Sequence, residues 1–154
     1  MSDVIGRIHS FESFALVDGP GIRCAVFLHG CALRCKFCHN PDTWRPCDRL
    51  IHMTPTELRQ KLVRYKHYWK RHGGVTFSGG EPLAQKDFLH AIVDACREDG
   101  IGCAVETSLI YYDEELFRKL DLVMADLKIW DDEIHKKYTG VSNVKIKEHF
   151  QKLN

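Results

Sequence analysis

The chain has 154 residues, 44% of them hydrophobic, and 22 Lys and Arg stand against 21 Asp and Glu. This length suffices for one domain with a hydrophobic core, and a formal net charge of +1 gives no electrostatic reason to expect nucleic acid or an anionic membrane as a partner. No apolar run reaches transmembrane length and no signal-peptide pattern opens the chain. A cytoplasmic protein without a membrane segment is therefore expected.

Strand and helix patterns alternate along the chain. Apolar runs predict strands near residues 4–9 and over 23–28, 75–77, 102–107 and 122–125. Apolar residues at helical spacing predict helices over 55–69, 88–96, 114–120, 132–138 and 143–153. This alternation favours an α/β fold with a parallel sheet and right-handed crossovers, as one domain over residues 1–154.

The helix that begins after residue 54 has the clearest start signal. Thr54-Pro55-Thr56-Glu57 is a capping box with proline at the first helical position. Leu58, Leu62, Tyr65 and Trp69 follow at helical spacing, and Gly73-Gly74 is expected to end the helix.

The unusual sequences of the chain follow the predicted strands. A cysteine-rich loop follows the first strand of the repeat, and Gly79-Gly80-Glu81 follows the second. Glu106-Thr107 ends the third strand, and Asp126 and Lys128 follow the fourth. Ligands of parallel α/β sheets gather at the carboxyl ends of the strands, so these motifs are predicted to converge on one rim.

Cys31, Cys35 and Cys38 have the spacing Cys-x3-Cys-x2-Cys. Three thiolates on one loop can hold three corners of a cubic iron–sulfur cluster, which would leave one iron open to a small molecule. The alternative is structural zinc, which needs four closed ligands, and the only spare ligand nearby is His39. The other four cysteines, three in apolar segments and one in a polar loop, are expected to have no ligand role: Cys24, Cys96, Cys103 and Cys47.

The remaining motifs each have two interpretations. Gly79 and Gly80 let the backbone approach a ligand closely, with Glu81 accepting from an ammonium group, or they form an ordinary strand–helix turn. Asp126 and Lys128 point to the same side of a strand, where they contact a ligand or form a surface ion pair. The constrained turn over 17–23 either borders the site or is only a turn.

The number of strands is small for a closed barrel. An eight-stranded (β/α) barrel needs about 200 residues or more, whereas the repeat here has about four strands. We therefore expect a partial barrel, truncated after about four β/α units. A fragment, a short family member and a chain that completes its sheet with a partner all fit this pattern.

The cysteine spacing together with Gly79-Gly80-Glu81 resembles the radical S-adenosylmethionine (SAM) enzymes. Further segments resemble one branch, the activating enzymes of glycyl radical enzymes, and most closely the pyruvate formate-lyase activating enzymes. These segments are residues 5–12, 17–23, 38–40, 42–44, 74–83, 121–128 and 139–143.

The resemblance implies a 4Fe–4S cluster on the three cysteines, with SAM chelating the open iron. Phe37 and His39 would flank the SAM adenine. The implied SAM contacts elsewhere are Gly79, Gly80 and Glu81 at the methionine amino group, and Asp126, Leu127 and Lys128 at the fourth strand. Asp18 would lie near the incoming glycine loop of the substrate protein. A monovalent cation site would use Glu106, Thr107, Met124 and Asp126, with glutamate where aspartate is usual.

The resemblance also implies partners: a glycyl radical enzyme of the pyruvate formate-lyase type, and flavodoxin or ferredoxin as reductant. Two other functions stay open on the sequence. One is the activase of anaerobic ribonucleotide reductase, a family of short chains. The other is a fragment that binds a cluster or zinc and performs no chemistry.

Overall fold

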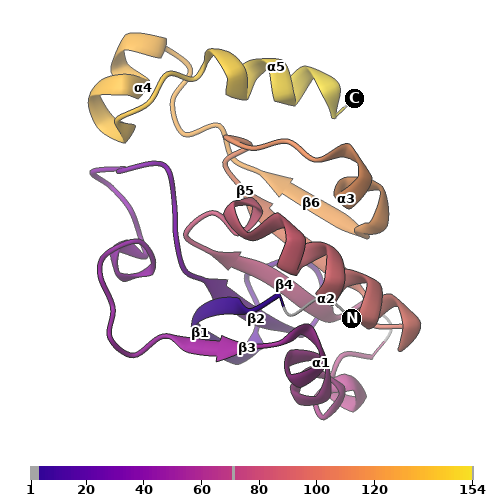
Figure 1. Ribbon diagram of the computed structural model, residues 1–154. Helices are drawn as coiled ribbons and strands as arrows, with labels where there is room; N and C mark the ends of the chain where they lie inside the picture. Colours follow the sequence, from indigo (N-terminus) through magenta and orange to yellow (C-terminus); the bar gives the residue numbers. More distant parts are fainter. Residues whose placement is uncertain (1–3, 71, 154) are drawn as a thin grey trace.

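The computed structural model describes residues 4–70 and 72–153, which form a six-stranded sheet with helices packed on it (Figure 1). The spatial order of the strands is β3 (Ile51–Met53), β1 (Gly6–Ala15), β2 (Arg23–Leu28), β4 (Gly74–Gly79), β5 (Cys103–Thr107) and β6 (Leu122–Ala125). The pairs β2–β4, β4–β5 and β5–β6 are parallel, which confirms the predicted α/β architecture for the four strands of the repeat.

The N-terminal edge of the sheet differs from the expectation. β1 runs on to Ala15, well past the predicted strand near 4–9, and it pairs antiparallel with both β2 and β3. β3 has only three residues, too few for a periodic pattern to reveal it in the sequence. A hairpin between β1 and β2 needs no crossover helix, so the alternation of strand and helix begins only after β2.

Three helices cover one face of the sheet: α1 (Pro55–Val63), α2 (Lys86–Glu98) and α3 (Glu114–Lys119) (Figure 1). α4 (Asp132–Thr139) and α5 (Val144–Lys152) follow β6 and lie apart from these three, above β5 and β6 in the view of Figure 1. Short 3-10 turns complete the elements: η1 (Pro41–Thr43), η2 (Lys66–Tyr68) and η3 (Pro82–Gln85). None of the helices in the described ranges is long and apolar enough to cross a membrane.

The two faces of the sheet differ in chemistry because side chains alternate along each strand. On β4, Val75 and Phe77 belong to the hydrophobic core beneath the helices, whereas Thr76 and Ser78 point to the other face. Cys24, Cys96 and Cys103 are buried at 1%, 0% and 0% exposure, as predicted for core thiols. The face away from the helices is therefore the one that carries polar groups.

The helix predicted over 55–69 is shorter in the structure. α1 ends at Val63, and the chain continues through η2. The backbone N–H of Tyr65 donates to Leu62 O at 2.9 Å, an i to i−3 bond that tightens the last turn. With this change of pitch, the Trp69 side chain lies in the core at 4% exposure. Tertiary packing, and not the helical spacing of apolar residues up to Trp69, therefore sets the end of α1.

The capping box of α1 is present as predicted. Glu57 N donates to Thr54 Oγ1 at 3.2 Å, and Thr54 N donates back to Glu57 Oε2 at 2.7 Å. We expect Thr54→Ala to lower the free energy of unfolding by about 1 kcal/mol, measured by urea denaturation. Thr56→Ala is the matched control, because Thr56 lies in the same turn and is not the capping residue. An equal loss in both variants would contradict the capping role.

Candidate functional site

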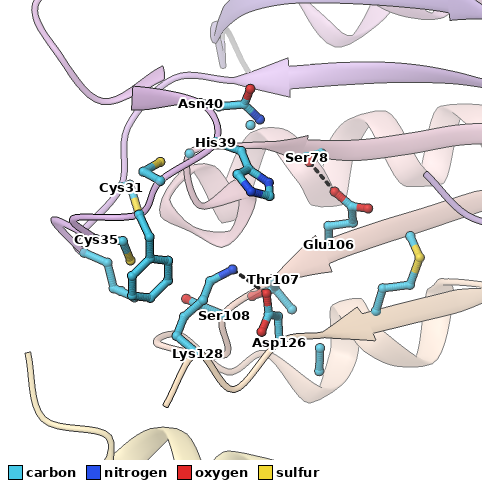
Figure 2. A pocket seen from close by; sticks show the side chains of 17 residues that line it. Cys31, Cys35, His39, Asn40, Ser78, Glu106, Thr107, Ser108, Asp126 and Lys128 are labelled. Atoms are coloured by element: carbon cyan, nitrogen blue, oxygen red, sulfur yellow. Dashed lines mark hydrogen bonds and ion pairs between the residues drawn. The ribbon is translucent and has the colours of Figure 1, made fainter. Parts of the chain in front are cut away.

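A cavity of about 510 Å³ opens at the carboxyl ends of β4, β5 and β6. Figure 2 shows side chains from the cysteine loop and from the strand ends pointing into one space. Most of the residues selected from the sequence line it: Cys31, Cys35, Phe37, Cys38, His39, Gly79, Gly80, Glu106, Thr107, Met124, Asp126 and Lys128. The parallel strands place their carboxyl ends at one edge, which brings segments nearly 100 positions apart into a single wall.

The three cysteines of the loop are free and half-buried. Burial raises the pKa of the Cys31 thiol to about 11. Burial also raises the pKa of Cys35, against the opposing charge of Lys128. A metal binds the thiolate and displaces its proton, so metal binding here releases protons from thiols whose pKa is raised.

A closed single-metal site is not preformed in the described residues. Across 4–70 and 72–153, no three His, Cys, Asp or Glu side chains are grouped so that they could hold one metal ion. Thiolates spread around a cavity of this volume have the softness that iron–sulfur clusters require. Three thiols on one cavity wall are a donor set that an iron–sulfur cluster can use.

Gly79, the last residue of β4, lies against the end of β2, and Gly80 lies against the start of the cysteine loop. Gly79 has φ +111, a conformation that favours glycine. A Cβ on Gly80 would lie 2.3 Å from Gly30 O and 3.3 Å from Cys31 Cβ, and Glu81 N donates to Gly30 O at 2.7 Å. The absence of a side chain at residue 80 therefore lets the two loops meet and leaves their backbone at the cavity surface.

We expect Gly80→Ala to lower the free energy of unfolding by about 1–3 kcal/mol, because the added methyl group overpacks against backbone that cannot move independently. Gly102→Ala is the matched control at the other end of the sheet, where the nearest atom to the new Cβ would be 3.3 Å away. Urea denaturation of the two variants measures the difference. A loss no greater for Gly80→Ala than for the control would contradict this packing argument.

Glu81 does not line the cavity, although the sequence suggested a contact with an ammonium group. Its side chain lies beneath the cavity floor at 1% exposure. Oε1 accepts from Leu83 N and Thr107 Oγ1 at 3.2 and 2.8 Å, and Oε2 accepts from Ser108 N and Ser108 Oγ at 3.0 and 2.6 Å. Burial raises the pKa of this carboxyl, and the four hydrogen bonds oppose the rise. The carboxylate thus joins the turn after β4 to the end of β5.

The inner wall of the cavity is formed by neighbouring strands. Ser78 Oγ donates to Glu106 Oε2 across β4 and β5 (Figure 2), while the Thr107 hydroxyl is engaged with Glu81. Sequence reasoning missed Ser78, Ser108 and Asn40, which also line the cavity. The signal for Ser78 was its register: it alternates with Val75 and Phe77 of the core and therefore faces the opposite side.

Asp126 and Lys128 line the outer wall and form an ion pair with each other (Figure 2). This arrangement combines the two interpretations of the sequence, because the pair is both a salt bridge and part of the cavity. Leu127 lies between them and is not among the residues that line the cavity. Alternation explains this, since adjacent residues of an extended segment point to opposite sides.

The turn over residues 16–22 folds back against the polar face of the sheet. Thr76 Oγ1 donates to the carbonyl oxygen of Asp18 at 2.6 Å, and the buried Arg23 Nε donates to Thr76 Oγ1 at 2.6 Å. Partial burial and the nearby charge of Glu12 raise the pKa of Asp18. Asp18 does not line the cavity, but a Cβ on the adjacent Gly19 would lie 3.5 Å from Met124 Cε of the cavity wall.

Comparison with known proteins agrees with this geometry. The profile of the Radical SAM superfamily matches residues 25–154, a range that holds the whole cavity wall. The chain belongs to the radical SAM superfamily. The superfamily implies a 4Fe–4S cluster and SAM as cofactors. The three thiols, the bare glycine backbone and the volume of the cavity fit both groups.

Within the radical SAM superfamily, curated proteins that are similar to this chain include pyruvate formate-lyase activating enzymes. The chain is 51% identical over 140 residues to the pyruvate formate-lyase-activating enzyme of Clostridium pasteurianum, covering 89% of this chain and 58% of that protein. It is 46% identical over 146 residues to the pyruvate formate-lyase 1-activating enzyme of Escherichia coli K12, covering 91% and 59%. A Listeria monocytogenes pyruvate formate-lyase-activating enzyme is 40% identical, with coverage of 95% and 62%. The chain thus spans about three fifths of the length of these relatives.

Solved structures show the same fold. QueE from Escherichia coli superposes with a TM-score of 0.67 at 16% identity, over 96% of this chain and 68% of that one. Streptococcus suis SuiB bound to the precursor peptide SuiA gives a TM-score of 0.60 at 19% identity, over 80% and 28%. At these identities the likeness concerns the sheet and its helices alone.

Proposed function

We propose that Cys31, Cys35 and Cys38 bind the 4Fe–4S cluster of this radical SAM chain. The support is their shared place on the wall of one cavity, together with a chemistry suited to iron. No fourth cysteine lines that cavity among the described residues, so three thiolates leave one iron for SAM. Cys47 lies outside the cavity and has no ligand role in this proposal.

We propose that SAM occupies the rest of the cavity. Phe37 and His39 lie on the wall beside the cysteines and offer flat surfaces to an adenine. The exposed backbone at Gly79 and Gly80 accepts the methionine amino group, while Lys128 exchanges its partner Asp126 for the methionine carboxylate. Glu81 acts from beneath by holding Thr107 and Ser108 in place.

A monovalent cation site between the inner and outer walls is part of the same proposal. Glu106, Thr107, Met124 and Asp126 all line the cavity. Oxygen ligands suit hard cations, and the two carboxylates come from adjacent strand ends.

We propose that the chain acts as the activase of a glycyl radical enzyme of the pyruvate formate-lyase type. The observation that carries this proposal is the 40–51% identity to activating enzymes of that name. When bound, the two cofactors supply a one-electron cleavage of SAM whose radical product removes a hydrogen atom from a glycine Cα of the partner. Flavodoxin or ferredoxin supplies the electron, in the cytoplasm, and Asp18 borders the incoming glycine loop.

Electron paramagnetic resonance tests this function. The anaerobically reconstituted chain is incubated with SAM, a reductant and pyruvate formate-lyase, and a glycyl doublet is the expected result. A doublet formed only with anaerobic ribonucleotide reductase would favour that second activase function. Iron incorporation without SAM cleavage would favour a fragment that only binds the cluster, and zinc without iron would overturn the cluster assignment.

A further inference from the structure

The cysteine loop is bonded to the end of a helix far away in the sequence. Arg34 N donates to Thr139 O at 2.7 Å, and Lys36 N donates to Tyr138 O at 2.8 Å. Cys35 lies between these two anchored residues and lines the cavity. Hydrogen bonds to α4 thus hold the backbone on both sides of Cys35, and the Cys35 side chain lies at the cavity (Figure 2).

The end of α4 is itself a built turn. Gly140 adopts φ +83 and its N–H donates to Lys136 O at 2.9 Å, which closes the helix in the left-handed conformation. Thr139 Oγ1 donates to His135 O at 2.8 Å, and His135 Nδ1 donates to Val141 O at 2.7 Å. Thr139 and His135 are both at 0% exposure, so the Thr139 carbonyl group that receives Arg34 N belongs to a buried, hydrogen-bonded turn.

The connection from α4 to α5 is held from the other side by a buried asparagine. Asn143 Nδ2 donates to the carbonyl oxygens of Ile129 and Trp130, each at 2.8 Å. Asp132 accepts from Ser142 Oγ at 2.7 Å and from Asn143 N at 2.8 Å. Asn143 is at 0% exposure, and its contacts join α4 and α5 to the segment that follows Asp126 and Lys128. The turn is therefore bonded both to the cysteine loop and to the segment that follows Lys128.

We propose that residues 138–143, here named the α4–α5 turn, position the cysteine loop for cluster binding. The turn supplies two carbonyl acceptors that fix the backbone on each side of Cys35, and Gly140 and Asn143 are its positioning residues. None of the residues of this turn is among those that line the cavity. The effect of the turn on cluster binding rests on the proposed function. The positioning of the cysteine loop by the turn does not depend on that function.

Two glycine variants separate positioning from ordinary stability. Gly140→Ala places a side chain in the left-handed region, and its Cβ would meet Arg34 Cβ at an ordinary 3.8 Å. Gly100 lies just after the end of α2 with φ +64, and a Cβ there would meet only Lys66 Nζ, at 3.9 Å. Gly100→Ala therefore imposes the same kind of backbone strain away from the cysteine loop and serves as the matched control.

Hydrogen–deuterium exchange on the full chain without cluster measures the result. We expect the amides of residues 31–38 to exchange about tenfold faster in Gly140→Ala, because left-handed strain at a non-glycine residue is of this order, and to be unchanged in Gly100→Ala. Unchanged exchange in Gly140→Ala, or an equal increase in both variants, would overturn the proposal. If Gly140→Ala does not fold, Asn143→Ala takes its place. The amides of residues 31–38 are then expected to exchange faster in Asn143→Ala than in Gly100→Ala, and equal exchange would overturn the proposal.

Iron retention tests the link to the cluster separately. After anaerobic reconstitution, Gly140→Ala is expected to lose iron to a chelator about tenfold faster than Gly100→Ala, as supporting contacts of metal ligands affect affinity by about 10–100-fold. Equal rates of iron loss in the two variants would show that the turn does not affect cluster binding. The positioning of the loop would then be decided by hydrogen–deuterium exchange alone. Failure of the unaltered chain to take up iron would instead count against the proposed function.

Discussion

Cys35→Ala is expected to abolish iron loading and SAM cleavage. Cys35 is one of three thiols on the cavity wall, and its loss leaves two cysteine ligands where the proposed cluster needs three. Changes to groups that merely support metal ligands already cost about 10–100-fold in affinity or activity, so a loss of more than about 100-fold is expected for the ligand itself. Iron analysis and a SAM-cleavage assay after anaerobic reconstitution provide the measurement.

Cys47→Ala is the matched control for this experiment. Cys47 is also a free, half-buried thiol in a loop, but it lies outside the cavity. We expect its replacement to leave iron content and SAM cleavage unchanged. Full iron loading in Cys35→Ala, or equal losses in both variants, would show that the cavity thiols are not the ligands.

Glu81→Ala is expected to lower the free energy of unfolding by about 3–5 kcal/mol. The carboxylate receives four hydrogen bonds beneath the cavity floor, and truncation leaves buried donors without an acceptor and creates a void. Glu81→Gln keeps the size and shape of the side chain. Its amide NH2 is a donor, however, and must face other donors: either those of Leu83 and Thr107 or those of Ser108. We therefore expect it to cost about 1–3 kcal/mol.

Urea denaturation of the chain without cofactors measures both Glu81 variants. Glu106→Gln is the matched control, because Glu106 lines the cavity and its carboxylate accepts a single side-chain hydrogen bond, from Ser78. We expect its effect on unfolding to be the smaller one. Unchanged stability in Glu81→Ala, combined with weakened SAM binding, would restore the interpretation of Glu81 as a direct ligand contact.

The pKa of Glu81 adds a pH dependence to this comparison. Burial raises it above the ordinary 4.5, so the native state binds a proton more tightly than the unfolded chain. The stability that this group contributes is fully present below pH 4.5 and is lost as the pH rises through the native value. Wild type is therefore expected to lose stability relative to Glu81→Gln over that interval, and parallel pH curves in urea titrations would contradict it.

Much of the repeat could be predicted because its signals are local. The core strands β4 and β5 are short apolar runs, and α2 has an apolar stripe, so period and composition alone indicate them. The capping box at Thr54 predicted the start of α1 to the residue. Its end could not be predicted, because the packing of Trp69 decides where the helical pitch changes.

The site residues divide in the same way. The cysteine spacing, the two glycines and the strand-end position of Asp126 are features of the sequence, and the topology of a parallel sheet is enough to expect them at one rim. The placement of Glu81 could not be expected. Which way a side chain turns after a strand depends on the donors that surround it, and Ser108 follows a different strand, β5.

The sequence by itself determined the alternation of strands and helices, the thiol chemistry and the membership of the radical SAM superfamily, because these depend on residue type and spacing. Only the tertiary structure decided that β1 pairs antiparallel, that Glu81 lies beneath the cavity, and that Thr139 receives the backbone of the cysteine loop. Each of these depends on hydrogen bonds between residues distant in the chain. Such partners leave no periodic signal in one sequence, since a backbone carbonyl group is the same at every position.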